Sequence, residues 1–197
     1  MVINSIVNVS TMSHAPMEKK DVNIALAVID VQKKFTMQGL DNSAAIEKIN
    51  KATALFRRNG RPVIFLCFDG PSHCSTYDEK EGDEYLQGIV SDQRDIVVHK
   101  EHMNSFLKSR LIDVMKESGC DTLLIAGMFT QACVIGTYYG AIDQEISPYL
   151  LVGGTIATEE RFNEAAYTLC KTLKLEEAEE TILTKKIPES SKRGSMH

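Results

Sequence analysis

Five short runs of almost uninterrupted apolar residues recur along the chain, and they restrict its possible folds more than any other feature. They cover positions 24–29, 62–68, 96–98, 122–126 and 149–152. A strand with one face in water alternates apolar and polar residues, whereas a parallel strand covered on both faces is nearly all apolar. The runs therefore predict the strands of a buried parallel sheet.

Segments with helical spacing separate these runs. The first follows a capping candidate at Asn42 or Ser43 and ends before Gly60, and the second lies between Ser105 and Gly119. Strands alternating with helices predict an α/β fold with helices on both faces of the sheet. A last short strand is expected near 181–184. The apolar stripes of the three helices are Ile46, Ile49, Ala52 and Phe56; Leu107, Leu111, Val114 and Met115; and Phe162, Ala165, Ala166, Leu169 and Leu173.

The length and charge of the chain exclude several classes of protein. Its 197 residues fit one domain, which we expect over 21–187, after a flexible extension at 1–20 and before a polar tail at 188–197. The polar stretch 69–94 is interpreted as a loop or lid. The net charge of −5 is spread without long basic runs, which argues against nucleic-acid binding. No apolar stretch is long enough for a membrane span, so no membrane partner is expected.

The five cysteines do not form the pattern of a disulfide framework. They stand at positions 67, 74, 120, 133 and 170, an odd number without a C-x-x-C pair. We do not expect a secretion signal, because the first twenty residues lack a basic leader before an apolar stretch. We therefore expect reduced thiols in a cytoplasmic protein. The absence of C-x-x-C also argues against a thiol redox protein.

Three chemically active side chains follow predicted strands. Asp30 ends the first run, Lys100 follows the third, and the fourth leads through a glycine to Cys133. Ligands of open parallel sheets bind beyond the carboxyl ends of the strands, and these ends lie at one edge. A carboxylate, an ammonium and a thiol are therefore expected at one site.

The position of Cys133 after its strand favours a nucleophile. Thr130 suits a helix N-cap, which would place Cys133 in the first helical turn, where free N–H groups favour a thiolate. Lys100 would lower the pKa of the thiol further, and Asp30 could accept its proton and deliver it to a leaving amine. Backbone N–H groups of the turn could hold an oxyanion. This combination predicts acyl transfer through a thioester.

Three segments together resemble the isochorismatase-like cysteine hydrolases. They are positions 29–35 (IDVQKKF), Lys100 with Asn104-Ser105-Phe106, and positions 127–134 (GMFTQACV), and Thr137 and Ala141 continue the pattern. The resemblance covers roughly 22–175. It implies a three-layer α/β/α Rossmann-like fold with a six-stranded, mainly parallel sheet, and an Asp-Lys-Cys triad of Asp30, Lys100 and Cys133. It also implies a cis peptide at Met128–Phe129, with oxyanion donors from the Phe129 and Cys133 N–H groups.

Departures from the family pattern narrow the expected chemistry. Nicotinamidases of this family carry a D-x-H…H metal site after the second strand, whereas this chain has Asp69 and His73 with no histidine between them. We therefore expect no metal and no cofactor. True isochorismatases cleave an enol ether and generally lack the cysteine, so Cys133 favours cleavage of an amide, carbamoyl or ureide C–N bond. An ether hydrolase and a non-catalytic scaffold of the same fold are the alternatives.

The remaining candidates concern substrate binding and assembly. Gln32 either orients Asp30 or caps a strand end, and Phe35 either contacts substrate or belongs to the core. Tyr138 lies on the helix beyond Cys133, where it or Tyr139 either touches substrate or packs at a subunit interface. His99 and His102 are interpreted as solvent-facing. A small-molecule substrate and a homo-oligomer are expected.

Overall fold

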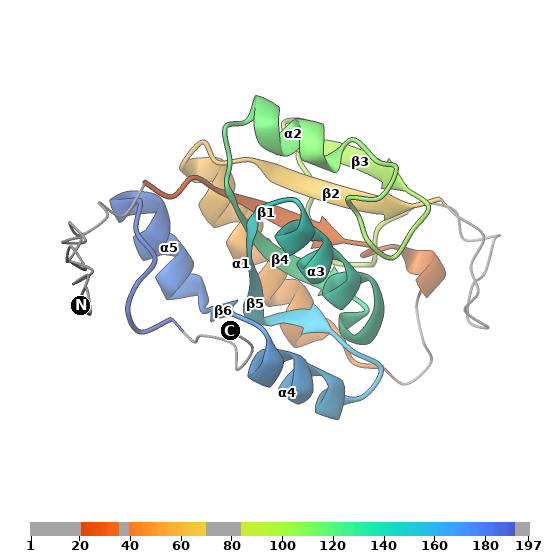
Figure 1. Ribbon diagram of the computed structural model, residues 1–197. Coiled ribbons are helices and arrows are strands. Elements are labelled where there is room, and N and C mark those ends of the chain that lie inside the picture. Colours follow the sequence, from red (N-terminus) through yellow and green to blue (C-terminus); the bar gives the residue numbers. More distant parts are fainter. Residues whose placement is uncertain (1–20, 36–39, 70–83, 192–197) are drawn as a thin grey trace, which may run out of the picture.

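The computed structural model describes residues 21–35, 40–69 and 84–191, and these form one parallel sheet covered on both faces (Figure 1). All five pairs of neighbouring strands are parallel. The strand order is β3-β2-β1-β4-β5-β6. The six strands are β1 (Ile24–Ile29), β2 (Val63–Phe68), β3 (Ile96–Lys100), β4 (Thr122–Met128), β5 (Ser147–Ile156) and β6 (Thr172–Leu173).

Helices form the two outer layers, which confirms the three-layer α/β/α prediction. Helices α1 and α5 contribute side chains to the core on one face, whereas α2, α3 and α4 contribute to the core on the other. In Figure 1, α2 and α3 lie in front of the sheet and α1 lies behind it. The bounds are α1 (Ser43–Arg58), α2 (Leu111–Glu117), α3 (Ile135–Asp143), α4 (Glu160–Leu169) and α5 (Leu175–Thr184), with short turns η1 (Lys33–Phe35) and η3 (Thr130–Val134).

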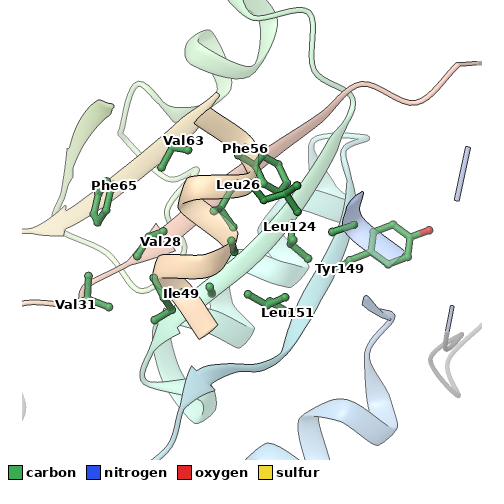
Figure 2. Packing of buried hydrophobic residues seen from close by; sticks show 14 of the residues in the cluster. Leu26, Val28, Val31, Ile49, Phe56, Val63, Phe65, Leu124, Tyr149 and Leu151 are labelled. Carbon is green, nitrogen blue, oxygen red and sulfur yellow. The ribbon is translucent and has the colours of Figure 1, made fainter. Parts of the chain in front are cut away.

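The central strand β1 shows why the runs are continuously apolar. Leu26 and Val28 belong to the core beneath α1, whereas Ala25, Ala27 and Ile29 belong to the core on the opposite face. Figure 2 shows Leu26 and Val28 under the α1 residues, with side chains of β2, β4 and β5 beside them. A fully buried side chain of this kind contributes roughly 1.5–3 kcal/mol. Because both faces of β1 are buried, a polar side chain on either face would lose its hydration. An alternating apolar and polar pattern is therefore excluded in this strand.

Helix α1 has the bounds that its sequence predicts. It buries Ile49, Ala52 and Phe56 at helical spacing, and its N-cap is Asn42. The first turn is tied by the Ser43 N–H, which donates to the Asp41 carboxylate at 2.9 Å. The helix stops at the Asn59-Gly60 pair, where Gly60 has a φ of +63°. A glycine reaches this left-handed conformation without a steric cost.

The C-terminal prediction is wrong in one respect. Residues 181–184 belong to helix α5, and the last strand is β6, which contains Leu173, a residue predicted to lie on a helix. Two residues are too few to produce a recognisable apolar run. The segment 175–184 has instead two glutamates in its first turn and buries Ala178 and Thr181, three apart. Acidic groups near a helix N-terminus are stabilised by the helix dipole.

Several predictions fall outside the described residues or are only partly covered. The extension 1–20, part of the polar tail and positions 70–83 of the expected loop or lid lie outside them. The described end of that loop is bound to the chain after β1: the Leu86 N–H donates to the Val31 carbonyl at 2.8 Å, and the Lys33 N–H to the Glu84 carbonyl at 2.7 Å. Across the described part of the chain, no helix has the length and apolarity of a membrane span.

Candidate active site

The predicted site lies where the strand order changes direction. From β1 the chain proceeds to β2 and β3 on one side of the sheet, and then to β4 on the other side of β1. Such a switch point leaves a crevice at the carboxyl ends of the two central strands. Asp30 follows β1, the turn η3 with Cys133 follows β4 by one residue, and Lys100 ends β3.

Asp30 leaves the end of β1 in an unusual backbone conformation. Its φ is +51°, in the left-handed region, which aspartate tolerates better than most residues. The turn is held on both sides, since the Asp30 N–H donates to the Leu66 carbonyl at 2.9 Å and the Gln32 N–H donates to the Asp30 carbonyl at 2.8 Å. Asp30 is only 2% exposed. The carboxylate is therefore fixed in a buried position at the sheet edge.

Lys100 reaches this carboxylate from two strands away. Its ammonium donates to Asp30 Oδ2 at 2.7 Å and to the His102 carbonyl at 3.1 Å. On the way it passes the intervening strand, where Nζ lies 4.7 Å from the centre of the Phe68 ring. An aromatic face attracts a cation at this distance. The length of the lysine side chain therefore brings Lys100 and Asp30 together, as predicted.

Cys133 completes the group, and its thiol interacts with both the Asp30 carboxylate and the Lys100 ammonium. Asp30 Oδ1 is buried and accepts no well-aligned hydrogen bond within residues 21–35, 40–69 and 84–191. Burial raises the pKa of Asp30, while the neighbouring Lys100 counteracts it. An incompletely satisfied carboxylate with a raised pKa is a competent proton acceptor.

The expectation of a thiolate at Cys133 is wrong for the resting protein. Burial raises the pKa of the thiol to about 12, and the negative charge of Asp30 acts in the same direction. Lys100 lowers this pKa, but less than burial and Asp30 raise it. The predicted helix start is also shifted, because Phe129 rather than Thr130 is the N-cap and η3 is a π-helical turn. At neutral pH the resting thiol therefore keeps its proton.

The chain before Cys133 requires a close approach of β4 to β1. The Met128–Phe129 peptide bond is cis, as predicted. Gly127 pairs with Ile29 and has a φ of +107°, and a Cβ atom there would lie 2.1 Å from the Ile29 carbonyl oxygen. The Phe129 carbonyl then accepts the N–H groups of Ala132 at 3.0 Å and Val134 at 3.3 Å. Only glycine allows this path from strand to turn.

Gln32 and Phe35 lie in the segment that follows Asp30. Gln32 is fully buried, and its Oε1 accepts the Phe68 N–H at 2.9 Å, which binds the end of β2 to the turn after β1. The Phe35 ring centre lies 6.0 Å from that of Phe68 and 6.5 Å from that of Phe129, edge to face in both cases. These three rings form an aromatic group that contacts the Lys100 ammonium through Phe68.

The structure does not bring Tyr138 to the site. It belongs to the core between α3 and the sheet, and its hydroxyl accepts the Lys171 N–H at 2.9 Å beside β6. The reason is helical direction, since five residues after Cys133 the side chain points to a different face. Tyr139 is 36% exposed and packs edge to face against Tyr138 at 5.5 Å.

Lys34 was missed by the sequence reasoning. It is buried, and its ammonium donates to the Phe68 carbonyl. Its charge favours ionised Asp30, as Lys100 does, against the larger effect of burial. The sequence offered one signal for its burial, which is its place directly before Phe35 in the segment after Asp30. A second cation therefore lies close to Asp30.

The residues considered for a metal site have other arrangements. The Asp69 carboxylate lies 2.7 Å from Nδ1 of His99, and both side chains are partly exposed. His73 lies outside the described residues. Among the residues whose placement is described, no group of three or more His, Cys, Asp and Glu side chains is arranged to hold a metal ion.

Known proteins share this fold and sequence pattern. A cysteine hydrolase from Pseudomonas syringae pv. phaseolicola superposes with a TM-score of 0.71 at 16% identity, covering 88% of this chain and 100% of that one. N-carbamoylsarcosine amidase from Thermoplasma acidophilum gives 0.63 at 21% identity, covering 73% and 90%. In sequence, the uncharacterized isochorismatase family protein YrdC of Bacillus subtilis (strain 168) is 28% identical over 138 residues, 68% of this chain and 73% of its own length. The isochorismatase domain family matches residues 24–179, and the chain therefore belongs to the isochorismatase-like hydrolases.

Proposed function

We propose that this protein is a cysteine hydrolase that cleaves the C–N bond of a small amide, carbamoyl or ureide substrate through a thioester on Cys133. The observation that supports this most is the group formed by the buried Asp30 and Lys100 with the partly buried Cys133. One oxygen of the Asp30 carboxylate accepts a hydrogen bond from the Lys100 ammonium at 2.7 Å. The other oxygen is buried without a well-aligned donor among the described residues. Such a carboxylate can hold the proton that the reaction must move.

In the first half of the reaction, Asp30 accepts the proton of the Cys133 thiol as the sulfur attacks the substrate carbonyl carbon. The C–S bond forms and the carbonyl oxygen takes up the negative charge. The tetrahedral intermediate then collapses, the C–N bond breaks, and the proton held by Asp30 passes to the leaving nitrogen. Lys100 offsets the charge of Asp30 at rest and stabilises the thiolate during attack.

In the second half, water hydrolyses the thioester. Asp30, again ionised, accepts a proton from the attacking water, and the C–S bond breaks when the second intermediate collapses. The thiolate recovers the proton from Asp30, which restores the resting state. We assign the oxyanion in both halves to the backbone N–H groups of Phe129 and Cys133, which belong to the turn after β4.

The choice of a C–N bond rests on the nucleophile. An acyl or carbamoyl carbon can form a thioester or thiocarbamate with Cys133, whereas hydrolysis of an enol ether does not require a thiol. A solved protein of the same fold is named as an N-carbamoylsarcosine amidase, which agrees with this bond type. We also assign substrate contact to Phe35, whose ring packs against Phe129. The ether hydrolase and the non-catalytic scaffold are the outcomes to be tested against this proposal.

The test is a screen of small amides, carbamoyl compounds and ureides with detection of released ammonia. Turnover by the wild-type protein that is lost in Cys133→Ala is the expected result. Acid quenching during turnover should leave one acyl or carbamoyl group on the Cys133 peptide, detected by mass spectrometry. Cys170→Ala, which removes a buried thiol elsewhere in the chain, is the control and should retain turnover. Full turnover by Cys133→Ala would end the proposal. Hydrolysis of an enol ether added to the screen, without turnover of any amide, carbamoyl compound or ureide, would favour the ether hydrolase.

Two further expectations accompany this function. A nucleophilic Cys133 must stay reduced, so we place the protein in the cytoplasm. We also propose a homo-oligomer in which Tyr139, partly exposed on α3, contributes to the interface. Light scattering at micromolar concentration measures the assembly, and the mass of a single chain of 21.9 kDa would contradict it.

A further inference from the structure

A buried polar network lies behind the turn that carries Cys133. Thr130, the first residue of η3, is fully buried, and its hydroxyl donates to Oδ1 of Asn163 at 2.7 Å. Asn163 lies on α4 and is 8% exposed. This bond joins segments 33 residues apart in the chain. A buried hydroxyl that loses its acceptor has no water to replace it, so the contact restrains the turn.

The remaining contacts of Asn163 fix the orientation of its amide. Oδ1 also accepts the Thr155 hydroxyl at 3.1 Å, and Nδ2 donates to the Glu160 carboxylate at 3.1 Å. The Thr155 hydroxyl shares a further hydrogen bond of 2.6 Å with the Tyr167 hydroxyl. The amide oxygen therefore faces Thr130 because the amide nitrogen is engaged on its other side.

The restrained residue lies in the same turn as the nucleophile. Thr130 begins η3 three positions before Cys133, and η3 packs against α4. A second bond acts on the same turn from the same region, because the Gln131 amide donates to the Thr158 hydroxyl at 2.9 Å. On the opposite side of the turn, Asp30 and Lys100 are held by the sheet. Cys133 therefore lies between Asp30 and Lys100, which the sheet holds, and the hydrogen bonds that restrain the start of its own turn.

We propose that Asn163 is a positioning residue that, through Thr130, holds the Cys133 thiol against Asp30 and Lys100. Its kinetic consequence rests on the proposed hydrolase function, whereas its effect on the thiol does not. Release of Thr130 lets η3 relax, which exposes Cys133 and moves it away from Asp30. Since burial and Asp30 are the two main causes of the raised pKa of Cys133, relaxation lowers this pKa.

The test compares two substitutions that each remove one buried hydroxyl from the same amide oxygen. Thr130→Val releases the turn, whereas Thr155→Val acts on β5 and leaves the Thr130 contact in place. We expect iodoacetamide to alkylate Cys133 in Thr130→Val at least about fivefold faster than in the wild type at pH 8, because more thiolate is present. Thr155→Val should stay within about twofold, and Thr130→Ser, which keeps the hydroxyl, should restore the wild-type rate. Asn163→Leu should reproduce Thr130→Val.

Turnover provides the second measurement. In Thr130→Val we expect kcat to fall about tenfold, the amount expected for one lost buried hydrogen bond, with KM within about twofold. A wild-type alkylation rate in Thr130→Val, or the same rate increase in Thr155→Val, would overturn the positioning role. If Asn163→Leu fails to fold, the threonine variants still decide. If the wild type hydrolyses no amide or ureide, the function fails, while the alkylation rates still decide the role of Asn163.

Discussion

The Lys100 ammonium lies 2.7 Å from Oδ2 of Asp30, although the strands that the two residues follow are separated by β2. Both side chains are almost fully buried. A buried ion pair adds little net stability, because removing two charges from water costs about as much as their attraction returns. Its clearest effect is to keep an ionised carboxylate inside the protein, beside Cys133.

Asp30→Asn should separate the acidity of Cys133 from its activity. The substitution removes the charge that raises the pKa of the thiol and leaves Lys100, which lowers it. We therefore expect Cys133 to be alkylated faster than in the wild type at pH 8, while turnover falls at least about 100-fold because the proton acceptor is lost. The first measurement is the rate of iodoacetamide alkylation of Cys133 between about pH 6 and 10. The second is the rate of ammonia release. Slower alkylation together with slower turnover would contradict these roles.

Lys100→Met should destabilise the protein more at high pH than at low pH. Without Lys100, burial acts on Asp30 with less opposition, so its folded-state pKa rises further above the unfolded value. A carboxyl group whose pKa is raised by folding binds its proton more tightly in the folded state. The free energy of unfolding therefore falls as the pH rises above the pKa of the unfolded state. We expect a loss of about 3–5 kcal/mol at pH 8 and a smaller loss near the unfolded pKa of about 4.

Urea unfolding at a series of pH values measures this difference. Lys116→Met is the matched control, because Lys116 is exposed in the last turn of α2. Its free energy of unfolding should change by less than about 0.5 kcal/mol at every pH. An equal loss in the free energy of unfolding of Lys100→Met at low and high pH would show that Asp30 does not become protonated when the lysine charge is removed.

The strand-end residues could be predicted from the sequence for a topological reason. Parallel strands bring their carboxyl ends to one edge whatever their order, so Asp30, Lys100 and the segment before Cys133 meet without any knowledge of packing. The direction of Tyr138 could not be predicted this way, since it depends on how α3 is rotated against the sheet. The hydroxyl of Tyr138 instead contacts the Lys171 backbone.

The acidity of Cys133 shows a different limit. A first-turn position and a nearby lysine favour a thiolate, and both effects can be anticipated from sequence. The opposing effect is the burial of the thiol beside Asp30, which is larger and depends on the assembled fold. The Asn163 contact was missed for the same reason: a single asparagine on a helix has no sequence pattern that identifies Thr130 as its partner.

Metal removal should leave activity unchanged. The chain lacks the D-x-H pattern after its second strand, and the Asp69 carboxylate is engaged by His99 at 2.7 Å. We expect that purified protein treated with EDTA or 1,10-phenanthroline keeps the turnover of the untreated protein. Metal analysis of both samples is the second measurement. Stoichiometric zinc or iron that is lost together with activity, and restored with it, would assign a metal to the reaction.

Gly127→Ala should disrupt the contact between β1 and β4. The added Cβ atom would lie 2.1 Å from the Ile29 carbonyl oxygen, a distance that backbone atoms cannot accommodate without a shift of the strand. We expect the free energy of unfolding to fall by more than about 3 kcal/mol. Turnover should be lost even in molecules that remain folded, because β4 carries η3 and the displaced strand moves Cys133 away from Asp30.

Gly119→Ala separates the two causes of this loss. Gly119 also has a positive φ, +62°, but a Cβ atom there has no neighbour within 4 Å. It therefore pays only the backbone cost, about 1–2 kcal/mol, and lies away from the site. The difference between the two variants in urea unfolding measures the close approach of the strands. Equal losses in the free energy of unfolding would mean that the positive φ alone explains the cost of Gly127→Ala. In that case β4 would accommodate the added Cβ atom without moving Cys133 away from Asp30.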